Sequence, residues 1–493
     1  MKPLYDALYE YAGKAAAVFH MPGHKLGRGF IPQDAFRNPA LIDATELDET
    51  DDLHSPRGPL RDAQELAAKA FGAGRTWFLV NGSSCGIFAM IAANCSAGKK
   101  LLIARDFHYS AFNAMRFARA RPIYIPVAHP ERGKRALDPE SVECALDIES
   151  VERAFKAHPD AAAVYITRPG YYGSVCDIAE ISRIAHSYGA RVLVDEAHGA
   201  HLAFSRRLPV SALEGGADFC VQSAHKTLPA FTQCAYAHAS PGAMSADAAC
   251  VRRFSEALRV FQTSSPSFML TASLDYAREY MSEFGGRELD RITGNCERFY
   301  ARMAQAGYGI PGGIHDGVAG RFGRDITRLV LDTRLLGLSG TEAERLLWSR
   351  HRIKIEMADP SHIVMIATVA DSDEDFDLLT GALLDVGSGF HARSHESAVD
   401  SARTLNASIA VFANIAETQA STAPAAPDFI IDLHRPVNRI PLAMAEGRTA
   451  AEIVAPYPPG ISLLCPGELI TAGMLDEIRM LLEEGIIIRG IEC

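Results

Sequence analysis

RVLVDEAHGAH at residues 191–201 and FCVQSAHK at residues 219–226 are the two stretches that decide the fold. Each begins as a short apolar run and passes directly into charged and polar side chains. Such a run predicts a buried strand followed by a loop. The first predicted strand ends near Asp195, and the second leads into Lys226. In a mostly parallel sheet, ligands bind beyond the carboxyl ends of the strands, so we expect the chemistry to lie in these two loops.

Similar apolar runs recur on both sides of this pair, between about residues 60 and 240. They are followed by stretches with helical periodicity, and this alternation is typical of an α/β domain with a mostly parallel sheet. The further strands are predicted at residues 77–80, 100–104, 122–127, 162–167 and 234–239, and two of the helices at residues 139–156 and 177–188.

The pattern changes after about residue 285, and 493 residues are enough for two or three packed units. A helix near 286–306, strands in ITRLVLD, RIKIEM and HIVMIAT, and a helix from about 373 predict a smaller α+β unit. We therefore predict five parts: an N-terminal segment at 1–58, a large domain at 59–285, a small α+β domain at 286–390, a variable linker or surface helix at 391–430, and a C-terminal segment at 431–493.

Composition excludes several classes of function. The 60 acidic residues outnumber the 49 basic ones, a net charge of −11, so we expect no nucleic-acid partner. No apolar run is long enough to predict a membrane span, and the N-terminus does not resemble a secretory signal. The ten cysteines are scattered without a C-x-x-C pair, so we interpret them as reduced thiols. We expect a cytoplasmic protein without a metal site.

Lys226 and Asp195 form a chemically meaningful pair. A lysine after a strand is more often a solvated side chain, but here a carboxylate also ends a buried strand, where it is costly without a cationic partner. Pyridoxal 5′-phosphate needs an amine to hold its aldehyde and a carboxylate to keep its ring nitrogen protonated. Lys226 and Asp195 would supply the two groups.

Two further loops follow predicted strands. NGSSCGI at 81–87 opens a helix and offers backbone N–H groups with Ser83 and Ser84 to a phosphate, although alone it could be a turn with a helix cap. RDFHYS at 105–110 offers His108 as a ring that could stack on the cofactor, although a histidine in such a place is more often structural. Ala197 and His198, just beyond Asp195, would lie near the cofactor ring.

Taken together, these motifs resemble the Orn/Lys/Arg decarboxylase family of fold-type I pyridoxal-phosphate enzymes, in its short form. The resemblance extends over about residues 19–475. It rests on these motifs together with MPGHK at 21–25, DDLHSPRG at 51–58, PGYYG at 169–173, SAHKTLPAFTQ from 223, SSPS at 264–267, PYPPG at 456–460 and CPGE at 465–468. It implies an aspartate-aminotransferase-like large domain and a smaller α+β C-terminal domain.

The resemblance also implies roles for individual residues. Lys226 would carry the cofactor as an internal aldimine, Asp195 would pair with the ring nitrogen, and His108 would stack on the ring. Lys226 or a nearby histidine such as His198 would return a proton to the substrate. The phosphate would be held by Ser83, Ser84, Ser223 and His225. Ser264 and Ser265 would come from the neighbouring subunit of a homodimer or higher homo-oligomer that shares its active sites.

The implied reaction is decarboxylation of arginine, lysine or ornithine, a step of polyamine biosynthesis. The sequence leaves the choice open, because one carboxylate can pair with an ammonium or a guanidinium. For that carboxylate we prefer Glu468 to the acidic run at 45–52, while helix capping is the alternative role of Glu468. Gly170 departs from the family pattern, which commonly has a threonine in that loop.

Two other functions remain open from the sequence. An aminotransferase, C–S lyase or aldolase of the same cofactor class would use the same lysine and aspartate. A catalytically silent homologue could act as a regulatory partner, but the presence of Lys226, Asp195 and the serine loop argues against it.

Overall fold

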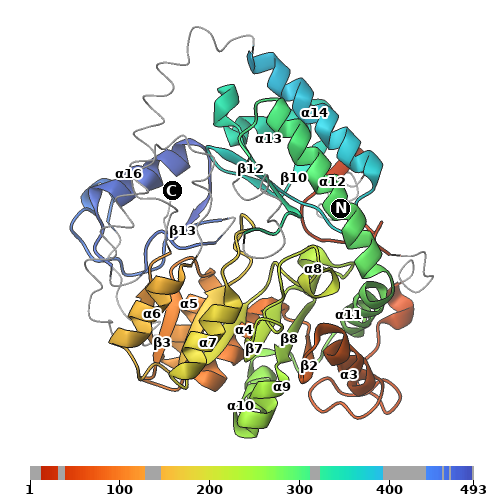
Figure 1. Cartoon of the computed structure of the whole chain (residues 1–493), viewed down its shortest axis with the longest axis vertical. Coiled ribbons are helices and arrows are strands. Elements are labelled where there is room, and N and C mark those ends of the chain that lie inside the picture. Colours follow the sequence, from red (N-terminus) through yellow and green to blue (C-terminus); the bar gives the residue numbers. More distant parts are fainter. Residues whose placement is uncertain are drawn as a thin grey trace.

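The computed structural model describes residues 11, 13–30, 39–127, 146–310, 323–391, 440–457, 460–465 and 468–490. Its centre is a seven-stranded sheet in the order β2-β8-β7-β6-β5-β3-β4 (Figure 1). Neighbouring strands are parallel except on both sides of β8, which runs antiparallel to β2 and β7. The strands are β2 (Arg75–Leu79), β3 (Lys100–Ala104), β4 (Arg121–Ile125), β5 (Ala163–Thr167), β6 (Arg191–Asp195), β7 (Phe219–Gln222) and β8 (Ala235–Ala239). The predicted mostly parallel α/β sheet is confirmed.

Alternating side chains of these strands enter hydrophobic clusters on opposite faces of the sheet. Leu193 of β6 packs in one cluster, whereas Val192 and Val194 pack in another. Because both faces of the sheet are buried, the strands consist of continuous apolar runs. Such runs are easily recognised in the sequence, so the predicted strand positions are accurate. The helices on the first face are α4 (Gly82–Asn94), α5 (Tyr109–Ala118) and α10 (Ala248–Phe261), and those on the second are α6 (Ile148–Ala157) and α7 (Ile178–Ser187).

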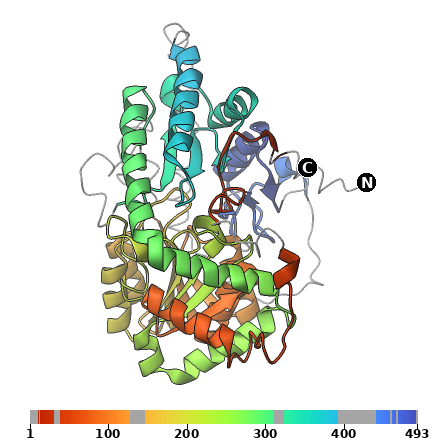
Figure 2. The same ribbon diagram turned by 90° about the vertical axis from the view of Figure 1, so that its right-hand side faces the viewer.

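A third layer lies over the β2 and β8 edge. Phe78 and Tyr236 share a cluster with residues of α3 (Pro59–Phe71) and α11 (Phe268–Tyr280). Figure 2 shows these two helices side by side. A five-residue π-helical segment, Met281–Gly285, joins α11 to α12 (Gly286–Gln305). The predicted boundary at 285/286 therefore falls inside a helical run that connects the two units, and the domain limits remain predictions.

The upper unit contains a three-stranded antiparallel sheet, ordered β11-β12-β9, under α12, α13 (Gly340–His351) and α14 (Asp373–His391) (Figure 1). Its strands are β9 (Arg328–Asp332), β11 (Met357–Ala358) and β12 (His362–Ile366). RIKIEM, predicted as one strand, is divided: β10 (Ile353–Ile355) pairs with β1 (Ala17–Phe19), whereas β11 pairs with β12. The prediction failed because the partner β1 comes from the N-terminal segment, far away in the sequence. Glu356 lies at the break.

The helix predicted at 139–156 is also corrected where the structure describes it. α6 begins at Ile148, because the Asp147 side chain accepts a hydrogen bond from Ser150 N and caps the helix. Residues 139–145 of that prediction lie outside the described residues, as do residues 392–430 of the predicted linker, while His391 ends α14.

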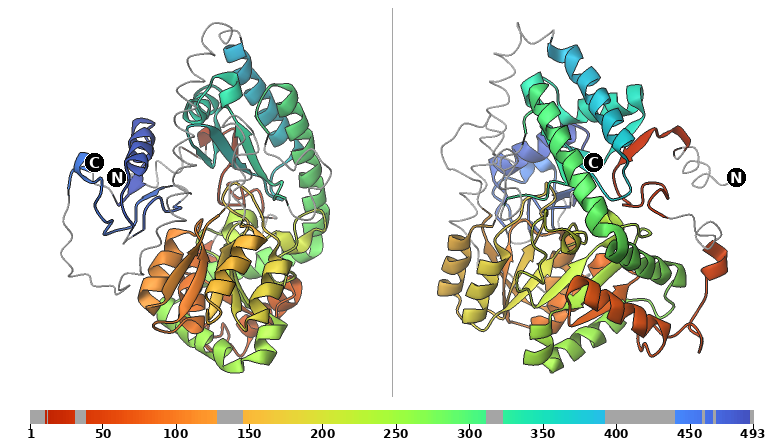
Figure 3. Two further views of the ribbon diagram at one scale, coloured as in Figure 1. Left: turned by 60° about the vertical axis from the view of Figure 1, so that its left-hand side comes forward. Right: turned by 45° about the vertical axis from the view of Figure 1, so that its right-hand side comes forward.

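The C-terminal segment forms a third body beside the other two (Figure 3, blue). It comprises β13 (Ala455–Pro456) and β14 (Ile488–Arg489), which pair antiparallel, and α16 (Ala472–Glu483). The Tyr109 N–H donates to Gly460 O at 3.1 Å and so joins this body to the start of α5. Among the described residues, no helix combines the length and the apolar character needed to cross a bilayer.

Candidate active site

The loop after β2 prepares an anion site at the start of α4. Gly82 has a φ of +74°, which suits glycine and turns the chain sharply from the strand into the helix. At Gly86, a Cβ atom would lie 2.7 Å from Leu79 and 2.9 Å from Val221, so only glycine lets α4 approach the sheet this closely. The sequence therefore places the helix N-terminus, with the N–H groups of its first turn, just after the carboxyl end of β2.

Two serines meet at this helix N-terminus. Ser223, which follows β7, donates its hydroxyl hydrogen to Ser83 Oγ at 2.8 Å. Ser223 is buried, Ser83 is half-buried, and Ser84 on the same turn is exposed. Two hydroxyls at a helix N-terminus suit a phosphate, whose oxygens accept hydrogen bonds. The structure thus brings Ser83 and Ser223 together, as the phosphate assignment requires.

Asp195 ends β6 and is 2% exposed. Its Oδ2 accepts from the Tyr165 hydroxyl at 3.1 Å, and its Oδ1 accepts from the Ala197 N–H at 3.1 Å. Burial raises the pKa of Asp195, while the positive charge of Lys226 opposes that shift. A cation brought close to this carboxylate would keep it ionised, which is what a protonated ring nitrogen would do. The residues present therefore fit pyridoxal phosphate.

Lys226 lies on the short helix α8 (Ala224–Thr227), just after β7. Its Nζ is 3.0 Å from Nε2 of His198. On the other side of that ring, Arg328 Nη2 is 2.6 Å from Nδ1. Burial lowers the pKa of Lys226 to about 8, with Asp195 and Glu356 acting against the shift and Arg328 adding to it. At this pKa about a tenth of the amine is neutral, and so nucleophilic, at pH 7, far more than for an ordinary lysine.

Two other predicted histidines also surround this lysine. His108 caps α5 by accepting from the Ser110 N–H, and a Cβ atom at Gly460 would lie 3.1 Å from its ring. Burial, and then the charge of Lys226, lower the pKa of His108 to about 4. His225 Nδ1 is 2.9 Å from Cys234 O. Both rings are therefore neutral at physiological pH, and the charge of Lys226 acts on each of them.

Ser264 and Ser265 are exposed in the single chain. Their loop adjoins the N-terminus of α4, because the Thr263 N–H donates to the side chain of Asn81 at 3.1 Å. Whether these serines contact the cofactor of a neighbouring subunit remains a prediction.

The substrate role of Glu468 stays a prediction, but the structure shows this carboxylate paired within the chain. This carboxylate forms an ion pair with Arg105 at 3.1 Å, and it also accepts from the Cys465 N–H at 2.7 Å. Both side chains of the ion pair are largely buried, so the negative charge of Glu468 is already neutralised. The alternative capping role is wrong, because Thr471 caps α16. Glu468 fastens the C-terminal segment to the loop after β3.

Glu356 is a carboxylate that the sequence analysis missed. Its oxygens accept from the Tyr171 hydroxyl at 2.7 Å and from the Met21 N–H at 3.0 Å, and no cation of the described residues lies within ion-pair distance. The Tyr171 ring packs against His198 at 5.1 Å, so Glu356 is separated from Lys226 by two side chains. RIKIEM reads as an ordinary strand, and the sequence carries no signal that marks this glutamate.

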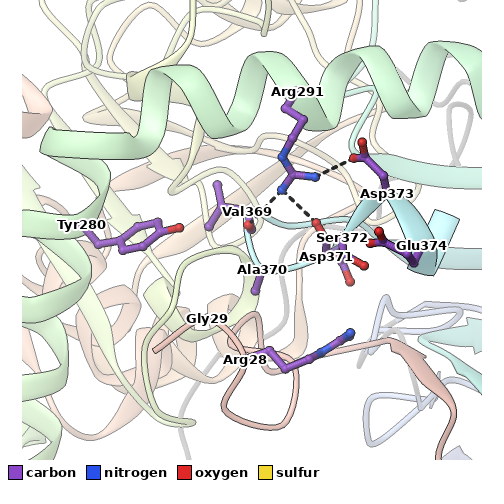
Figure 4. A pocket seen from close by; sticks show the side chains of 10 residues that line it. All are labelled: Arg28, Gly29, Tyr280, Arg291, Val369, Ala370, Asp371, Ser372, Asp373 and Glu374. Carbon is purple, nitrogen blue, oxygen red and sulfur yellow. Dashed lines mark hydrogen bonds and ion pairs between the residues drawn. The ribbon is translucent and has the colours of Figure 1, made fainter. Parts of the chain in front are cut away.

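A surface pocket elsewhere is lined by Arg28, Tyr280, Arg291 and the turn before α14 (Figure 4). Both arginines of the pocket already have carboxylate partners. Arg291 bonds Asp373 and two backbone carbonyl groups, and Arg28 pairs with Asp375. It contains none of the residues described above, and we do not assign the reaction to it.

Comparison of the chain with known proteins identifies its family. The major-domain model of the Orn/Lys/Arg decarboxylases matches residues 2–307, and the model of their C-terminal domain matches residues 407–485. The chain is 34% identical to an arginine decarboxylase of Bacillus subtilis and 32% identical to one of Bacillus anthracis, each covering 99% of this chain and 95% of the relative. The constitutive lysine decarboxylase of E. coli has the same fold, with a TM-score of 0.70 at 18% identity over 100% of this chain and 80% of that one.

These matches confirm the predicted fold-type I architecture and the predicted activity class, decarboxylation of a basic amino acid. The chain belongs to the Orn/Lys/Arg decarboxylase family.

Proposed function

We propose that this chain decarboxylates arginine with pyridoxal 5′-phosphate joined to Lys226. One observation carries the cofactor assignment: a lysine amine, a buried carboxylate and two hydroxyls at a helix N-terminus converge beyond the carboxyl ends of β6, β7 and β2. The full-length relatives named as arginine decarboxylases support the choice of substrate.

The protein's own groups have separate tasks in this proposal. Ser83 and Ser223 hold the phosphate, His108 covers one face of the ring, and Asp195 keeps the ring nitrogen protonated. When bound, the cofactor supplies an electron sink for the pair of electrons left when carbon dioxide departs. Lys226 or His198 returns the proton to the α-carbon of the substrate.

We assign the distal cation of the substrate to Glu356 instead of Glu468. A guanidinium loses water on entering the site, so it needs a negative partner there. Glu356 has a free negative charge that acts on Lys226, whereas Arg105 already neutralises Glu468. The hydrogen bonds from Tyr171 and Met21 hold Glu356 in place without using up its charge.

Glu356→Gln is expected to raise the KM for arginine about 30-fold. The amide keeps the shape of the side chain but loses the charge that meets the guanidinium, a loss of roughly 2 kcal/mol for one partner of a partly buried pair. Steady-state kinetics of carbon dioxide release would measure it. Glu468→Gln is the matched control, with an unchanged KM and a lower melting temperature. If only Glu468→Gln raised the KM, the substrate assignment would return to Glu468.

The activity itself is tested by supplying arginine, lysine and ornithine separately to the purified protein with added cofactor. We expect carbon dioxide and agmatine from arginine at the highest kcat/KM. A keto acid product would indicate an aminotransferase instead. A protein that binds no cofactor and turns over none of the three would be a silent homologue.

We further propose a cytoplasmic homodimer, or a larger assembly of dimers, that serves polyamine biosynthesis. Support for the dimer comes from Ser264 and Ser265, which are exposed yet lie in a loop that is hydrogen-bonded to Asn81 at the start of α4. The eight described cysteines are all free and buried, which suits a reducing compartment. Light scattering coupled to size exclusion measures the assembly directly.

A further inference from the structure

His198 is held between two side chains that both carry hydrogens on nitrogen. Arg328 Nη2 lies 2.6 Å from Nδ1 of the ring, and Lys226 Nζ lies 3.0 Å from Nε2. The ring is 6% exposed, and the Tyr171 ring packs edge-on against it at 5.1 Å. Arg328 is 1% exposed, and its Nε and Nη1 have no hydrogen-bond partner among the described residues.

The chemistry of the three groups allows one arrangement of hydrogens. A guanidinium has five N–H donors and no acceptor, so Nδ1 of His198 must offer its lone pair to Arg328. A neutral imidazole has one acceptor nitrogen and one N–H, so the hydrogen must be on Nε2. That hydrogen points at the Lys226 amine at 3.0 Å, which can receive it only as a neutral amine with a free lone pair.

We propose that Arg328 is a positioning residue: it fixes the tautomer of His198 so that Nε2–H donates to Lys226 and stabilises the unprotonated amine. An ammonium in the same place would set two donors against each other. The proposal rests on the proposed function only in taking Lys226 as the amine that must be neutral to react, and it concerns the protein before any cofactor is bound.

The surroundings of His198 also oppose its protonation. Burial, followed by the charges of Lys226 and Arg328, lowers the pKa of this ring well below its ordinary value. The imidazolium form, whose Nδ1–H would oppose an N–H of Arg328, is thus disfavoured at neutral pH. The negative charges of Asp195 and Glu356 act on Lys226 and favour its protonated form. The charge of Lys226 in turn lowers the pKa of His108 and His225.

The neighbouring loop fixes the position of Arg328. Gly173, with a φ of +90°, packs against Arg328 so closely that a Cβ atom would lie 2.8 Å from the arginine Cβ. The Arg328 guanidinium also faces the Tyr171 ring at 6.0 Å. Because Arg328 begins β9 of the upper unit and Lys226 follows β7 of the large sheet, the contact through His198 joins two separate sheets.

The test measures the reactivity of Lys226 in the protein freed of cofactor. Apoprotein is pulse-labelled with a small acylating reagent between pH 6 and 10, and the label on the Lys226 peptide is quantified by mass spectrometry. The exposed Lys156 serves as the internal reference for reagent reactivity. Four proteins are compared: wild type, Arg328→Met, His198→Phe and the double variant. Circular dichroism confirms that each is folded.

We expect Arg328→Met to raise the pH of half-labelling of Lys226 by about one unit or more, because Nε2 can then accept from an ammonium. Part of any shift arises from the lost positive charge alone. The double variant isolates that part, since no imidazole remains to transmit the effect. In the His198→Phe background, Arg328→Met should therefore shift the half-labelling pH by less than half as much.

Equal shifts in the two backgrounds would overturn the proposal, because Arg328 would then act only as a charge. The absence of any shift in Arg328→Met would overturn it as well. If Arg328→Met does not fold, His198→Phe alone decides: loss of the Nε2–H donor must raise the half-labelling pH, and an unchanged value contradicts the proposal. Labelling needs no turnover, so failure of this tautomer control is distinguishable from failure of the proposed decarboxylation.

Discussion

Lys226→Ala is expected to lose turnover completely, to below about one part in ten thousand of the wild-type rate. The lysine amine is the group that would hold the cofactor aldehyde, and its lowered pKa of about 8 makes it reactive near neutral pH. Alanine removes both the covalent attachment and one of the two groups proposed to return a proton to the α-carbon. Carbon dioxide release from arginine and the visible spectrum of the protein with added cofactor would measure the two losses.

Lys226→Arg is the matched control for this change. It keeps a positive charge beside Asp195 and His198 but has no amine that can condense with an aldehyde. Both variants should be inactive while remaining folded, as judged by circular dichroism. Substantial turnover by either one would show that Lys226 is not the attachment site.

Asp195→Asn is expected to lower kcat by roughly three orders of magnitude, about 4 kcal/mol of transition-state stabilisation. The amide keeps the size of the side chain and its contact with the Ala197 N–H, but it cannot hold the ring nitrogen in its protonated form. An unprotonated ring is a poor electron sink, so the step that releases carbon dioxide slows. Single-turnover measurements with cofactor in excess would separate this effect from weaker cofactor binding.

Asp106→Asn offers a comparison within the same buried region. Burial is the main cause that raises the pKa of Asp106 to about 7, with the charge of Asp195 adding to it. The carboxyl group is therefore about half protonated at neutral pH, and an amide replaces that form closely. We expect less than a tenfold change in kcat. Equal losses in Asp106→Asn and Asp195→Asn would remove the special role given to Asp195.

The large sheet and the positions of the proposed cofactor-binding residues could be predicted from the sequence. Strands buried on both faces appear as apolar runs, and Asp195 and Lys226 stand where such runs stop. Because the carboxyl ends of parallel strands meet at one edge, the proximity of these loops followed from the fold class. The Ser83–Ser223 contact is an example: 140 residues separate two serines whose strands end at the same edge.

Contacts between segments that are distant in the chain could not be predicted from the sequence. Glu356 has its position because β10 pairs with the N-terminal strand β1. No local periodicity in the sequence predicts that pairing. Glu468 stood out as an isolated acid in a turn, but its neutralising partner, Arg105, is 363 residues away. Arg328 is the first residue of an apolar strand, and from the sequence alone it would be interpreted as an ordinary charged residue at a strand end. In each case the deciding information is which opposite charge or hydrogen-bond partner lies nearby, and only the folded chain supplies it.

The most direct test of the central claim is to locate the cofactor on the chain. The protein is saturated with pyridoxal 5′-phosphate, treated with sodium borohydride to fix the linkage, digested, and examined by peptide mass spectrometry. We predict one phosphopyridoxyl group, on the peptide that contains Lys226, and none on that peptide in Lys226→Arg. A label on another lysine such as Lys25, or no fixed label at all, would contradict the assignment of Lys226.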